Sequence, residues 1–330
     1  MSPTLSSRST AAVGIESGVF DIAMNIASLL GNSMVCLAVY RNPRICVTTH
    51  LYIVALAVSD LLCAVGSMPF TVTTLVTGKW FFGKTVCEIQ AFIMYFVLNI
   101  SPSTTGLAAL NRYMRIIKTN NYSAIFSERR SKLLLASVWL SLVTYLLLVR
   151  STGWLNFTFY SGYASCVVSH ICEERNIIHY SLVISIYFVL PLSVAMFSYY
   201  HVYQTIRHHN LDIIPALQNR TRQARITLHE IKISKSLFLV MAGFVLCWVP
   251  MWTVVIVLRF FPTVTLDRTV WLIPVFLIYL SSTINPFIYA SSNRAYKTAF
   301  RRMFLSCRWN TFFHRRRRVA IAPMVPITLP

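Results

Sequence analysis

Seven stretches of about 20 apolar residues, separated by short polar segments, run through this chain of 330 residues. A bilayer core about 30 Å thick is crossed by roughly 20 helical residues, so each stretch is long enough to span a membrane. The stretches cover residues 19–40, 51–76, 89–110, 133–149, 177–200, 236–258 and 270–290. Because 56% of the residues are hydrophobic and only 12% are charged, a soluble domain of this size has too little core to bury them. The sequence predicts an all-α membrane protein, a bundle of seven transmembrane helices.

The segments outside the spans are short and predict a single membrane domain. We expect an N-terminal extracellular segment over residues 1–18, the seven-helix domain over 19–292, an amphipathic eighth helix over 293–306 and an arginine-rich tail over 307–330. The eighth helix is predicted because its aromatic residues fall on one face and its cations on the other. No cleavable signal peptide is expected, since residues 1–18 lack a continuous apolar core.

Lysine and arginine residues are distributed unevenly about the predicted spans. If the N-terminus is extracellular, 23 of the 30 lie in cytoplasmic segments and seven lie outside. Positive charge is retained on the cytoplasmic side, so we expect a plasma-membrane protein with an extracellular N-terminus and a cytoplasmic C-terminus. The net charge of +20 then indicates a surface for anionic membrane lipids and an acidic or amphipathic partner rather than for nucleic acid.

Asp60 lies in the middle of the second span, where a carboxylate must face the interior of the bundle. We identify it as the only acidic residue deep in any span. Polar residues that reach a similar depth are Asn32, Ser101, Ser281, Ser282 and Asn285. Oxygen ligands around one carboxylate suit a hard cation such as sodium, and a hydrogen-bonded structural network is the alternative.

The third span ends on its cytoplasmic side with Asn111-Arg112-Tyr113, which places a guanidinium at the inner mouth of the bundle. Glu230, at the inner end of the sixth span, is a candidate partner in an ion pair that would latch that helix. The alternative is that Arg112 anchors the helix to lipid headgroups.

Short motifs recur in order along the spans, each at a definite depth. They are Gly31-Asn32, Leu56-Ala57-Val58-Ser59-Asp60, Cys87, Asn111-Arg112-Tyr113, Trp139, Pro191 with Tyr199, Phe244 with Cys247-Trp248-Val249-Pro250, and Asn285-Pro286-Phe287-Ile288-Tyr289. Taken together, this set resembles the signature of the rhodopsin-like (class A) G-protein-coupled receptors over roughly residues 31–304. Each motif alone is weak, whereas the complete ordered set is specific.

The resemblance implies a receptor without catalytic activity, which binds an extracellular ligand in the outer half of the bundle and activates a heterotrimeric G protein. It implies no cofactor other than an allosteric sodium ion, held by Asp60, Ser101, Ser281 and Asn285. It also assigns Trp248 as a toggle beneath the ligand, with Phe244 below it. The full set of implied switch residues is Asn111, Arg112, Tyr113, Tyr199, Glu230, Phe244, Trp248, Pro250, Asn285, Pro286 and Tyr289.

Three covalent features follow from the resemblance and the topology. Cys87 is similar to the cysteine that pairs with the second outer loop, and its partner is either Cys166 or Cys172. We favour Cys166, because Tyr163-Ala164-Ser165-Cys166 resembles the loop of related receptors. Asn156 in that loop is a candidate for glycosylation. Cys307 is a candidate for palmitoylation, with an ordinary free thiol as the alternative.

By the same resemblance, the outer cavity is lined by aromatic and apolar side chains. The candidates are Met94, Tyr95, Tyr187, Phe188, Met251, Trp252, Val255, Trp271, Val275 and Tyr279. Such a cavity suits a neutral, flat or lipid-like molecule or the aromatic anchor of a peptide, and tight packing without a pocket is the alternative. Met94 stands where aminergic receptors carry an aspartate, and Tyr279 stands where opsins carry the retinal-linking lysine. Neither a monoamine nor linked retinal is therefore expected.

Residues 31–42 and 105–113 are similar to melatonin receptors, which share Asn111 where most relatives carry Asp. Pro286 and Tyr187 depart from that subfamily, so we expect different pocket chemistry. Pro102 also departs from the family pattern, at a position that usually holds a β-branched residue. Together with Asn111, it is expected to loosen the inactive state and to give measurable basal signalling.

The sequence also bears on two other classes of function. A channel or transporter that conducts ions past Asp60 is the main alternative to a receptor, although the chain shows neither internal repeats nor broken helices. An enzyme is not expected, because no paired catalytic carboxylates or activated nucleophile are present.

Overall fold

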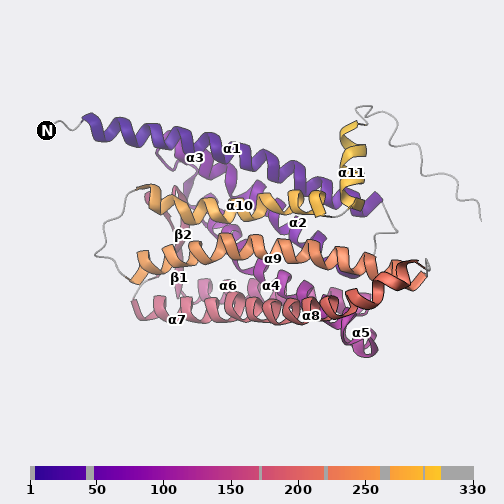
Figure 1. Cartoon of the computed structure of the whole chain (residues 1–330). Helices are drawn as coiled ribbons and strands as arrows, with labels where there is room; N and C mark the ends of the chain where they lie inside the picture. The colour runs from indigo at the N-terminus through magenta and orange to yellow at the C-terminus, as the bar shows by residue number, and fades with distance from the viewer. Residues whose placement is uncertain are drawn as a thin grey trace, which may run out of the picture.

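The computed structural model describes residues 4–41, 48–170, 173–218, 222–260, 268–292 and 294–305. Long helices lie side by side in one bundle, and a two-stranded hairpin lies at one end of it (Figure 1). The elements are α1 (Thr4–Arg41), α2 (Thr48–Gly66), α3 (Met68–Thr77), α4 (Gly83–Ile116), α5 (Thr119–Ile125), α6 (Glu128–Ser151), β1 (Leu155–Tyr160), η2 (Ser161–Tyr163), β2 (Ser165–His170), α7 (Glu173–Val183), η3 (Ile184–Val189), α8 (Leu190–Gln218), α9 (Arg222–Phe260), α10 (Arg268–Ser292) and α11 (Arg294–Leu305).

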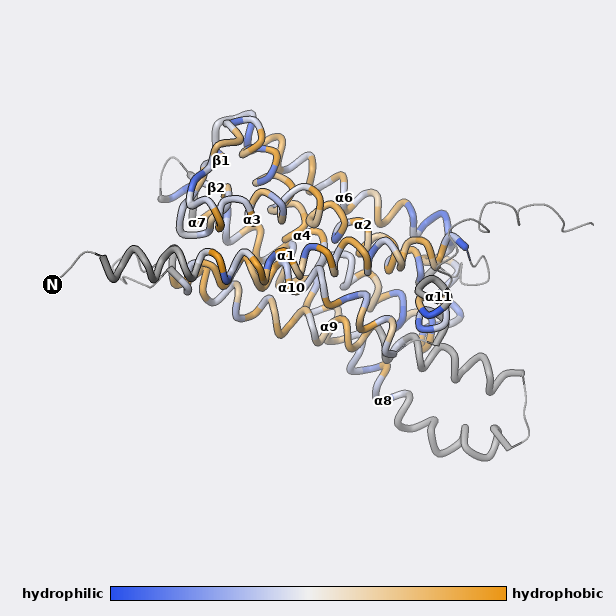
Figure 2. Tube along the Cα trace, turned by 90° about the horizontal axis from the view of Figure 1, so that it is seen from above, coloured by the Kyte–Doolittle hydropathy of each residue, from blue (hydrophilic) through white to orange (hydrophobic). Residues whose placement is uncertain are grey.

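Within the described residues, seven helical segments are long and apolar enough to cross a membrane. They correspond in order to the seven predicted spans, which confirms the predicted seven-helix fold. Large apolar side chains on the outside of the bundle are exposed, as on α6, where Leu140 is 64% and Leu147 is 57% exposed. Figure 2 shows hydrophobic residues along the middle of the helices and hydrophilic residues toward their ends, as expected for a bundle in lipid.

Two of the seven spans are not uniform α-helices. The second is divided into α2 and α3 at Ser67, two residues before Pro69, which has no N–H to continue the helical hydrogen bonds. The fifth consists of α7, the π-helical turn η3 and α8, and η3 ends two residues before Pro191. A π-helical turn accommodates an extra residue, so it changes which side chains share a face of the span.

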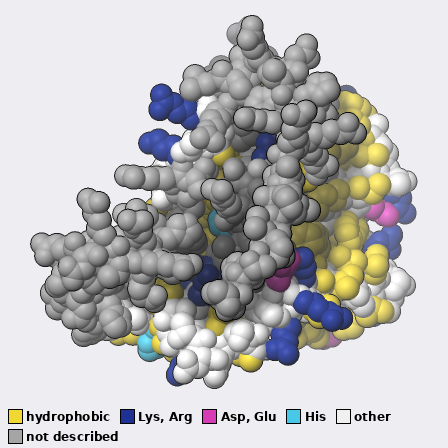
Figure 3. Space-filling model, turned by 90° about the vertical axis from the view of Figure 1, so that its right-hand side faces the viewer, with side chains coloured by type: hydrophobic (Ala, Val, Ile, Leu, Met, Phe, Trp, Pro, Cys, Tyr) yellow, Lys and Arg dark blue, Asp and Glu magenta, His cyan; other side chains and the backbone are white. Residues whose placement is uncertain are grey.

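The two ends of the bundle differ in structure and charge. We call the end that carries β1 and β2 the hairpin end. The opposite end, with α5 and α11, we call the basic end, and Figure 3 shows Lys and Arg side chains gathered on it. Its described cations include Arg41, Arg112, Arg115, Lys118, Arg129, Arg130, Lys132, Lys297 and Arg301.

Helix α11 occupies nearly the range predicted for the amphipathic eighth helix, and it turns away from the direction of α10 (Figure 1). Tyr296 and Phe300 are buried on one face, whereas Lys297 and Arg301 are exposed. The Tyr296 hydroxyl lies 2.9 Å from Nδ1 of His50, and burial raises the pKa of that hydroxyl. Attachment of α11 to a membrane surface stays a prediction.

Glycines allow the close approach of helices at two points in the bundle. A Cβ added to Gly31 would lie 2.8 Å from the ring of Pro286. At Gly106, it would lie 2.9 Å from the backbone oxygen of Pro191. Both distances are shorter than van der Waals contact, so α1 packs on α10 and α4 packs on α8 only because these positions lack a side chain.

We predict that Gly106→Ala lowers the midpoint of thermal unfolding of the purified protein, because overpacking typically costs about 1–3 kcal/mol. Gly243→Ala is the matched control, since a Cβ there would meet its nearest atom, in Ile288, at 3.4 Å. The control should be neutral or stabilising, because alanine favours a helix over glycine by ~1 kcal/mol. Equal midpoints for the two variants would contradict the close packing of α4 on α8.

Candidate functional site

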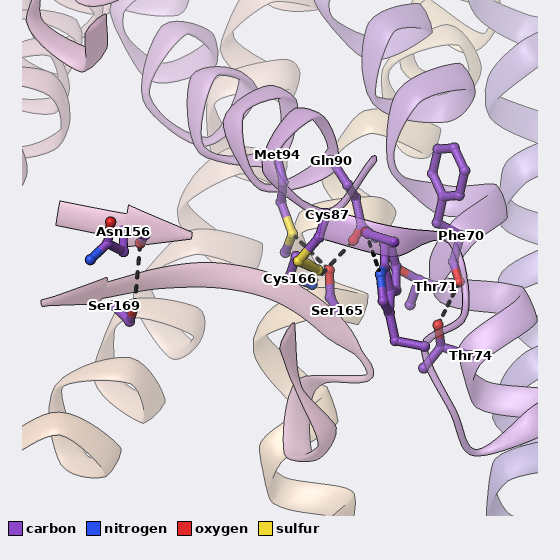
Figure 4. Close-up of a disulfide and its surroundings, with 12 residues drawn as sticks. Phe70, Thr71, Thr74, Cys87, Gln90, Met94, Asn156, Ser165, Cys166 and Ser169 are labelled. Atoms are coloured by element: carbon purple, nitrogen blue, oxygen red, sulfur yellow. Dashed lines mark hydrogen bonds between the residues drawn. A yellow bond between two sulfur atoms is a disulfide. The ribbon is translucent and has the colours of Figure 1, made fainter. Parts of the chain in front are cut away.

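The hairpin covers the end of the bundle and is tied to α4. Its strands are antiparallel, with Phe159 opposite Cys166. Cys166 forms a disulfide with Cys87 near the start of α4 (Figure 4). The backbone N–H of Cys166 also donates to Oε1 of Gln90, at 3.1 Å. The predicted Cys87–Cys166 bond is confirmed, and it excludes Cys172, which lies outside the described residues, as the partner of Cys87.

Beneath the hairpin lies a small cavity of about 80 Å³. Helices α4, α7, α9 and α10 form its wall, and β2 and Tyr163 form its roof. The described lining residues are Ala91, Met94, Tyr95, Leu98, Tyr163, Cys166, Val167, Val168, Tyr180, Met251, Trp252, Val255, Pro274, Val275 and Ile278. None of them carries a charge, so the cavity is an apolar and aromatic site.

Six of the ten candidate ligand residues line this cavity. They are Met94, Tyr95, Met251, Trp252, Val255 and Val275. Trp271 lies outside the wall and packs against the roof, with ring centroids 5.1 Å from Tyr160 and 5.3 Å from Tyr163. It therefore supports the roof from behind.

The other three candidates are turned away from the cavity. Tyr279 is fully buried, and its hydroxyl lies 2.9 Å from that of Ser67 and 2.7 Å from that of Thr71. Successive helical residues are rotated by about 100°, so Tyr279 faces α3 while its neighbour Ile278 faces the cavity. Tyr187 lines a groove on the outside of α4, α6 and α8, whereas Phe188 faces a lower cavity. Both lie in η3, where the π-helical turn alters the rotation of the side chains.

Polar groups at the cavity are few and differ in whether they are paired. The Met94 sulfur accepts a hydrogen bond from Ser165 at 3.6 Å. The indole N–H of Trp252 is buried and has no hydrogen-bond partner among the described residues. Buried donors are normally paired, so this N–H is a candidate contact for a ligand acceptor. Arg150, in the last turn of α6, is paired with Glu88 at 2.9 Å and does not line the cavity.

His179 was not predicted from the sequence, and it positions a wall residue. The ring is 1% exposed, and its Nε2 lies 2.7 Å from the hydroxyl of Tyr95, which lines the cavity. Its Nδ1 lies 2.7 Å from the hydroxyl of Tyr145 on α6. His179 thus holds Tyr95 in one orientation. Its position within the apolar fifth span is a signal that sequence analysis could have used.

A second, smaller cavity lies between α4, α8 and α9, and switch residues border it. Pro102, the residue that departs from the family pattern, lines this cavity together with Phe244 and Trp248. Phe188 and Pro191, from the fifth span, line the same cavity. The ring centroids of Phe244 and Trp248 are 5.8 Å apart, and Phe188 stacks on Trp248 at 6.2 Å. The proline therefore packs among the residues that the motifs single out, although it does not interrupt α4.

Asp60 lies at the centre of a buried polar cluster in the middle of the bundle. Asn285 donates to its carboxylate at 2.9 Å, and Ser282 forms a second hydrogen bond. Ser101 is 2% exposed, and its hydroxyl oxygen has no partner among the described residues. The hydroxyl of Ser281 donates instead to the backbone oxygen of Ile278, at 2.8 Å. Both the cation site and the structural network predicted from sequence are compatible with this geometry.

Asp60 is not the only buried acid, which corrects the sequence interpretation. Asp21 on α1 is fully buried as well, and both of its carboxylate oxygens lack partners among the described residues. The predicted span began at residue 19, so Asp21 was placed at its edge. Helix α1 begins instead at Thr4, which puts Asp21 well inside the helix.

At the basic end, Arg112 is fully buried and donates to Oδ1 of Asn111 at 3.3 Å. Asn111 in turn donates to the hydroxyl of Tyr122 on α5, also at 3.3 Å. Tyr199 lies within electrostatic range of Arg112, and Tyr289 within range of Tyr199. The hydroxyls of both tyrosines are buried and have no hydrogen-bond partner among the described residues.

The remaining predicted positions are less fully described. Tyr113 packs against the rings of Phe197 and His201 on α8. Glu230 belongs to α9, but its side chain lies outside the described residues, and so does Cys307. Asn156 lies on β1, where its backbone oxygen accepts from Ser169 (Figure 4). Its glycosylation, the palmitoylation of Cys307 and the Arg112–Glu230 pair stay predictions.

Known proteins similar to this chain are membrane receptors. The chain is 28% identical to the octopamine receptor beta-1R of Drosophila melanogaster, over 88% of this chain and 62% of that receptor. It is 26% identical to the human histamine H2 receptor, over 84% of this chain and 76% of the relative, and 30% identical to the human alpha-1A adrenergic receptor, over 86% and 66%. The chain thus spans somewhat less than two thirds of the octopamine receptor.

Structural comparison and family assignment agree with one another. The crystal structure of squid rhodopsin superposes with a TM-score of 0.78 at 21% identity, covering 89% of this chain and 86% of that one, and shows the same fold. Residues 31–289 match the family described as 7 transmembrane receptor (rhodopsin family). Members of this family are receptors and not enzymes. The chain belongs to the rhodopsin family of seven-transmembrane receptors.

Proposed function

We propose that this chain is a G-protein-coupled receptor for a neutral aromatic or lipid-like molecule, or for the aromatic anchor of a peptide. The observation that carries the proposal is the cavity under the hairpin, whose described lining is aromatic and apolar and carries no charge. Burial of apolar surface is the main source of affinity in such a site. Membership of a receptor family favours this function over an ion channel or transporter.

The amines after which several relatives are named, octopamine and histamine, do not suit this wall. A buried ammonium needs a carboxylate partner, because an unpaired buried charge is strongly unfavourable. Aminergic receptors carry an aspartate at the position of Met94. Met94 has only a thioether sulfur there, which already accepts a hydrogen bond from Ser165. The proposed ligand is therefore uncharged where it contacts α4.

One polar contact is proposed for the ligand. The unpaired indole N–H of Trp252 favours a molecule that presents a hydrogen-bond acceptor toward α9. Tyr95 is held by His179 and provides a flat aromatic surface on the other side. At about 80 Å³ the cavity is smaller than a drug-sized ligand requires, so binding is expected to displace the wall or the roof.

The basic end is the proposed contact for the G protein, in a chain whose N-terminus is extracellular. The Lys and Arg side chains gathered on this end support its location on the cytoplasmic side of the membrane (Figure 3). Tyr199 and Tyr289 support a rearrangement at that end, because buried hydroxyls without partners are available for new hydrogen bonds. In this scheme, the ligand shifts the population between two arrangements of the helices.

We also propose that Asp60, Ser101, Ser281 and Asn285 bind sodium in the inactive state. The unpaired oxygens of Ser101 and Asn285 next to a carboxylate support this site, since sodium is a hard cation that prefers oxygen ligands. No group of three or more His, Cys, Asp or Glu side chains that suits a transition metal occurs in the described part of the chain.

The ligand proposal is tested with cells that express the receptor and a panel of G-protein reporters. Indoles, neutral lipids and aromatic peptides form the panel of ligands, and indoles are included because residues 31–42 and 105–113 resemble melatonin receptors. We expect responses from this panel and none from octopamine or histamine. A response to those amines alone would contradict the proposal.

Trp252→Phe should reduce the potency of an agonist from this panel about tenfold, because it removes one buried hydrogen bond worth ~1–1.5 kcal/mol while keeping an aromatic ring. Trp139→Phe is the matched control, since Trp139 donates to Thr104 outside the cavity. Its potency should match that of the wild type at equal surface expression. Equal potency for both variants would show that Trp252 does not donate to the ligand.

Asn111→Asp should lower basal signalling. A carboxylate at this position forms a charge-assisted hydrogen bond to Arg112, roughly twice as strong as the present amide contact, and so restrains the guanidinium. Asn120→Asp is the control, because it adds the same charge at an exposed position on α5. Ligand-free accumulation of the second messenger is the measurement. Unchanged basal activity in Asn111→Asp would contradict the proposal that Asn111 restrains Arg112 only weakly.

A further inference from the structure

Asp21 is the buried acid that the proposed receptor function does not use. Its side chain is fully buried in the hairpin half of the bundle, away from the Asp60 cluster. Neither carboxylate oxygen has a hydrogen-bond partner among the described residues. Asp60, by contrast, accepts hydrogen bonds from Asn285 and Ser282. A carboxylate taken out of water without donors must gain a cation or a proton.

Contacts between helices show what surrounds Asp21. Thr283 on α10 donates to the backbone oxygen of Met24 on α1, at 3.3 Å. The two helices run in the same direction, so one turn back along each brings Asp21 level with Tyr279 (Figure 1). This placement agrees with the electrostatics, because the charge of Asp21 acts on the Tyr279 hydroxyl and on Cys63.

Several buried oxygens on this face of α1 have no hydrogen-bond partner among the described residues. Asn25 follows Asp21 by one helical turn on the same face, and its side-chain oxygen is also buried without a partner. The Tyr279 hydroxyl is already shared between Ser67 and Thr71. Three unpaired oxygens, two from Asp21 and one from Asn25, therefore lie together with no donor directed at them among the described residues.

We propose that Asp21 and Asn25, with the hydroxyl of Tyr279, form a second sodium site in the hairpin half of the bundle. A single cation can contact all three unpaired oxygens, whereas one proton bridges at most two. One carboxylate with neutral oxygens suits a monovalent cation, because divalent sites generally gather several carboxylates. The proposal does not depend on the identity of the ligand.

The two acidic sites are linked electrostatically. The charges of both Asp60 and Asp21 act on the Cys63 thiol on α2, so both carboxylates lie within electrostatic range of this one residue. Occupancy of either site by a cation lowers the negative potential at the other. Sodium at Asp21 is therefore expected to weaken binding at Asp60, and the reverse follows by thermodynamic linkage.

The test measures the thermal midpoint of the purified full-length receptor, without ligand or G protein, as sodium chloride replaces choline chloride at constant ionic strength. A ligand that binds only the folded state raises the midpoint, and the increase grows with the logarithm of the ligand concentration once that concentration exceeds the dissociation constant. Asp60→Asn should keep about half of the sodium-dependent shift, and Asp21→Asn with Asp60→Asn should lose it. A complete loss of the shift in Asp60→Asn alone would overturn the proposal.

Glu16→Gln is the matched control, because Glu16 is an exposed carboxylate on the same helix, five residues before Asp21. Its sodium-dependent shift should equal that of the wild type. If Asp60→Asn does not fold, sodium-23 relaxation on the wild type, Asp21→Asn and Glu16→Gln decides the question. A smaller bound-sodium signal in Asp21→Asn alone supports the site, and equal signals in all three overturn it. Because no ligand or G protein enters either measurement, its outcome leaves the receptor proposal unaffected.

Discussion

Polar groups inside a bilayer have no water to bond with, and this constraint organises the whole molecule. The backbone satisfies it by forming helices, and the side chains satisfy it by turning inward. Asn32, for example, donates to Ser28 on its own helix and to the backbone of Ser282 on α10. Polar residues therefore connect helices that apolar contacts alone would leave free to slide, because lipid competes equally for apolar surface.

The same constraint separates structural groups from those available for function. The amide nitrogen of Asn285 donates to Asp60, and His179 is paired with both Tyr95 and Tyr145. Other buried polar atoms are left without partners among the described residues, notably the Trp252 indole and the carboxylate of Asp21. In lipid such atoms are costly, so they mark the places where a ligand, an ion or a second conformation completes the structure.

Much of this architecture could be predicted from the sequence. Seven apolar stretches predict seven spans, and the resemblance of residues 163–166 to the loop of related receptors favoured Cys166, rather than Cys172, as the partner of Cys87. Rotation about each helix axis was harder, because an error of one residue turns a side chain by about 100°. Val275 lines the cavity as predicted, whereas Tyr279 faces α3 and Tyr187 is displaced by the π-helical turn.

The predicted start of the first span was also in error, and this error changed the interpretation of Asp21. Hydropathy placed the start of the first span close to Asp21, because polar residues before it lower the local average. Helix α1 nevertheless begins more than one turn before that predicted start, at Thr4, which leaves Asp21 within the bundle. The hairpin was also beyond prediction, since strand pairing in a loop depends on its disulfide and on contacts with α4 rather than on a periodic pattern.

Gln90 joins the roof of the cavity to the bend in the second span. Its oxygen accepts from the backbone of β2, and its nitrogen donates to the Ser67 carbonyl and to Thr71. Since a primary amide is planar and rigid, raising the roof also pulls on the joint between α2 and α3. In the proposed receptor, two ligands of similar affinity would therefore differ in signalling strength, according to how far each one lifts β2 and how much of that movement reaches the joint.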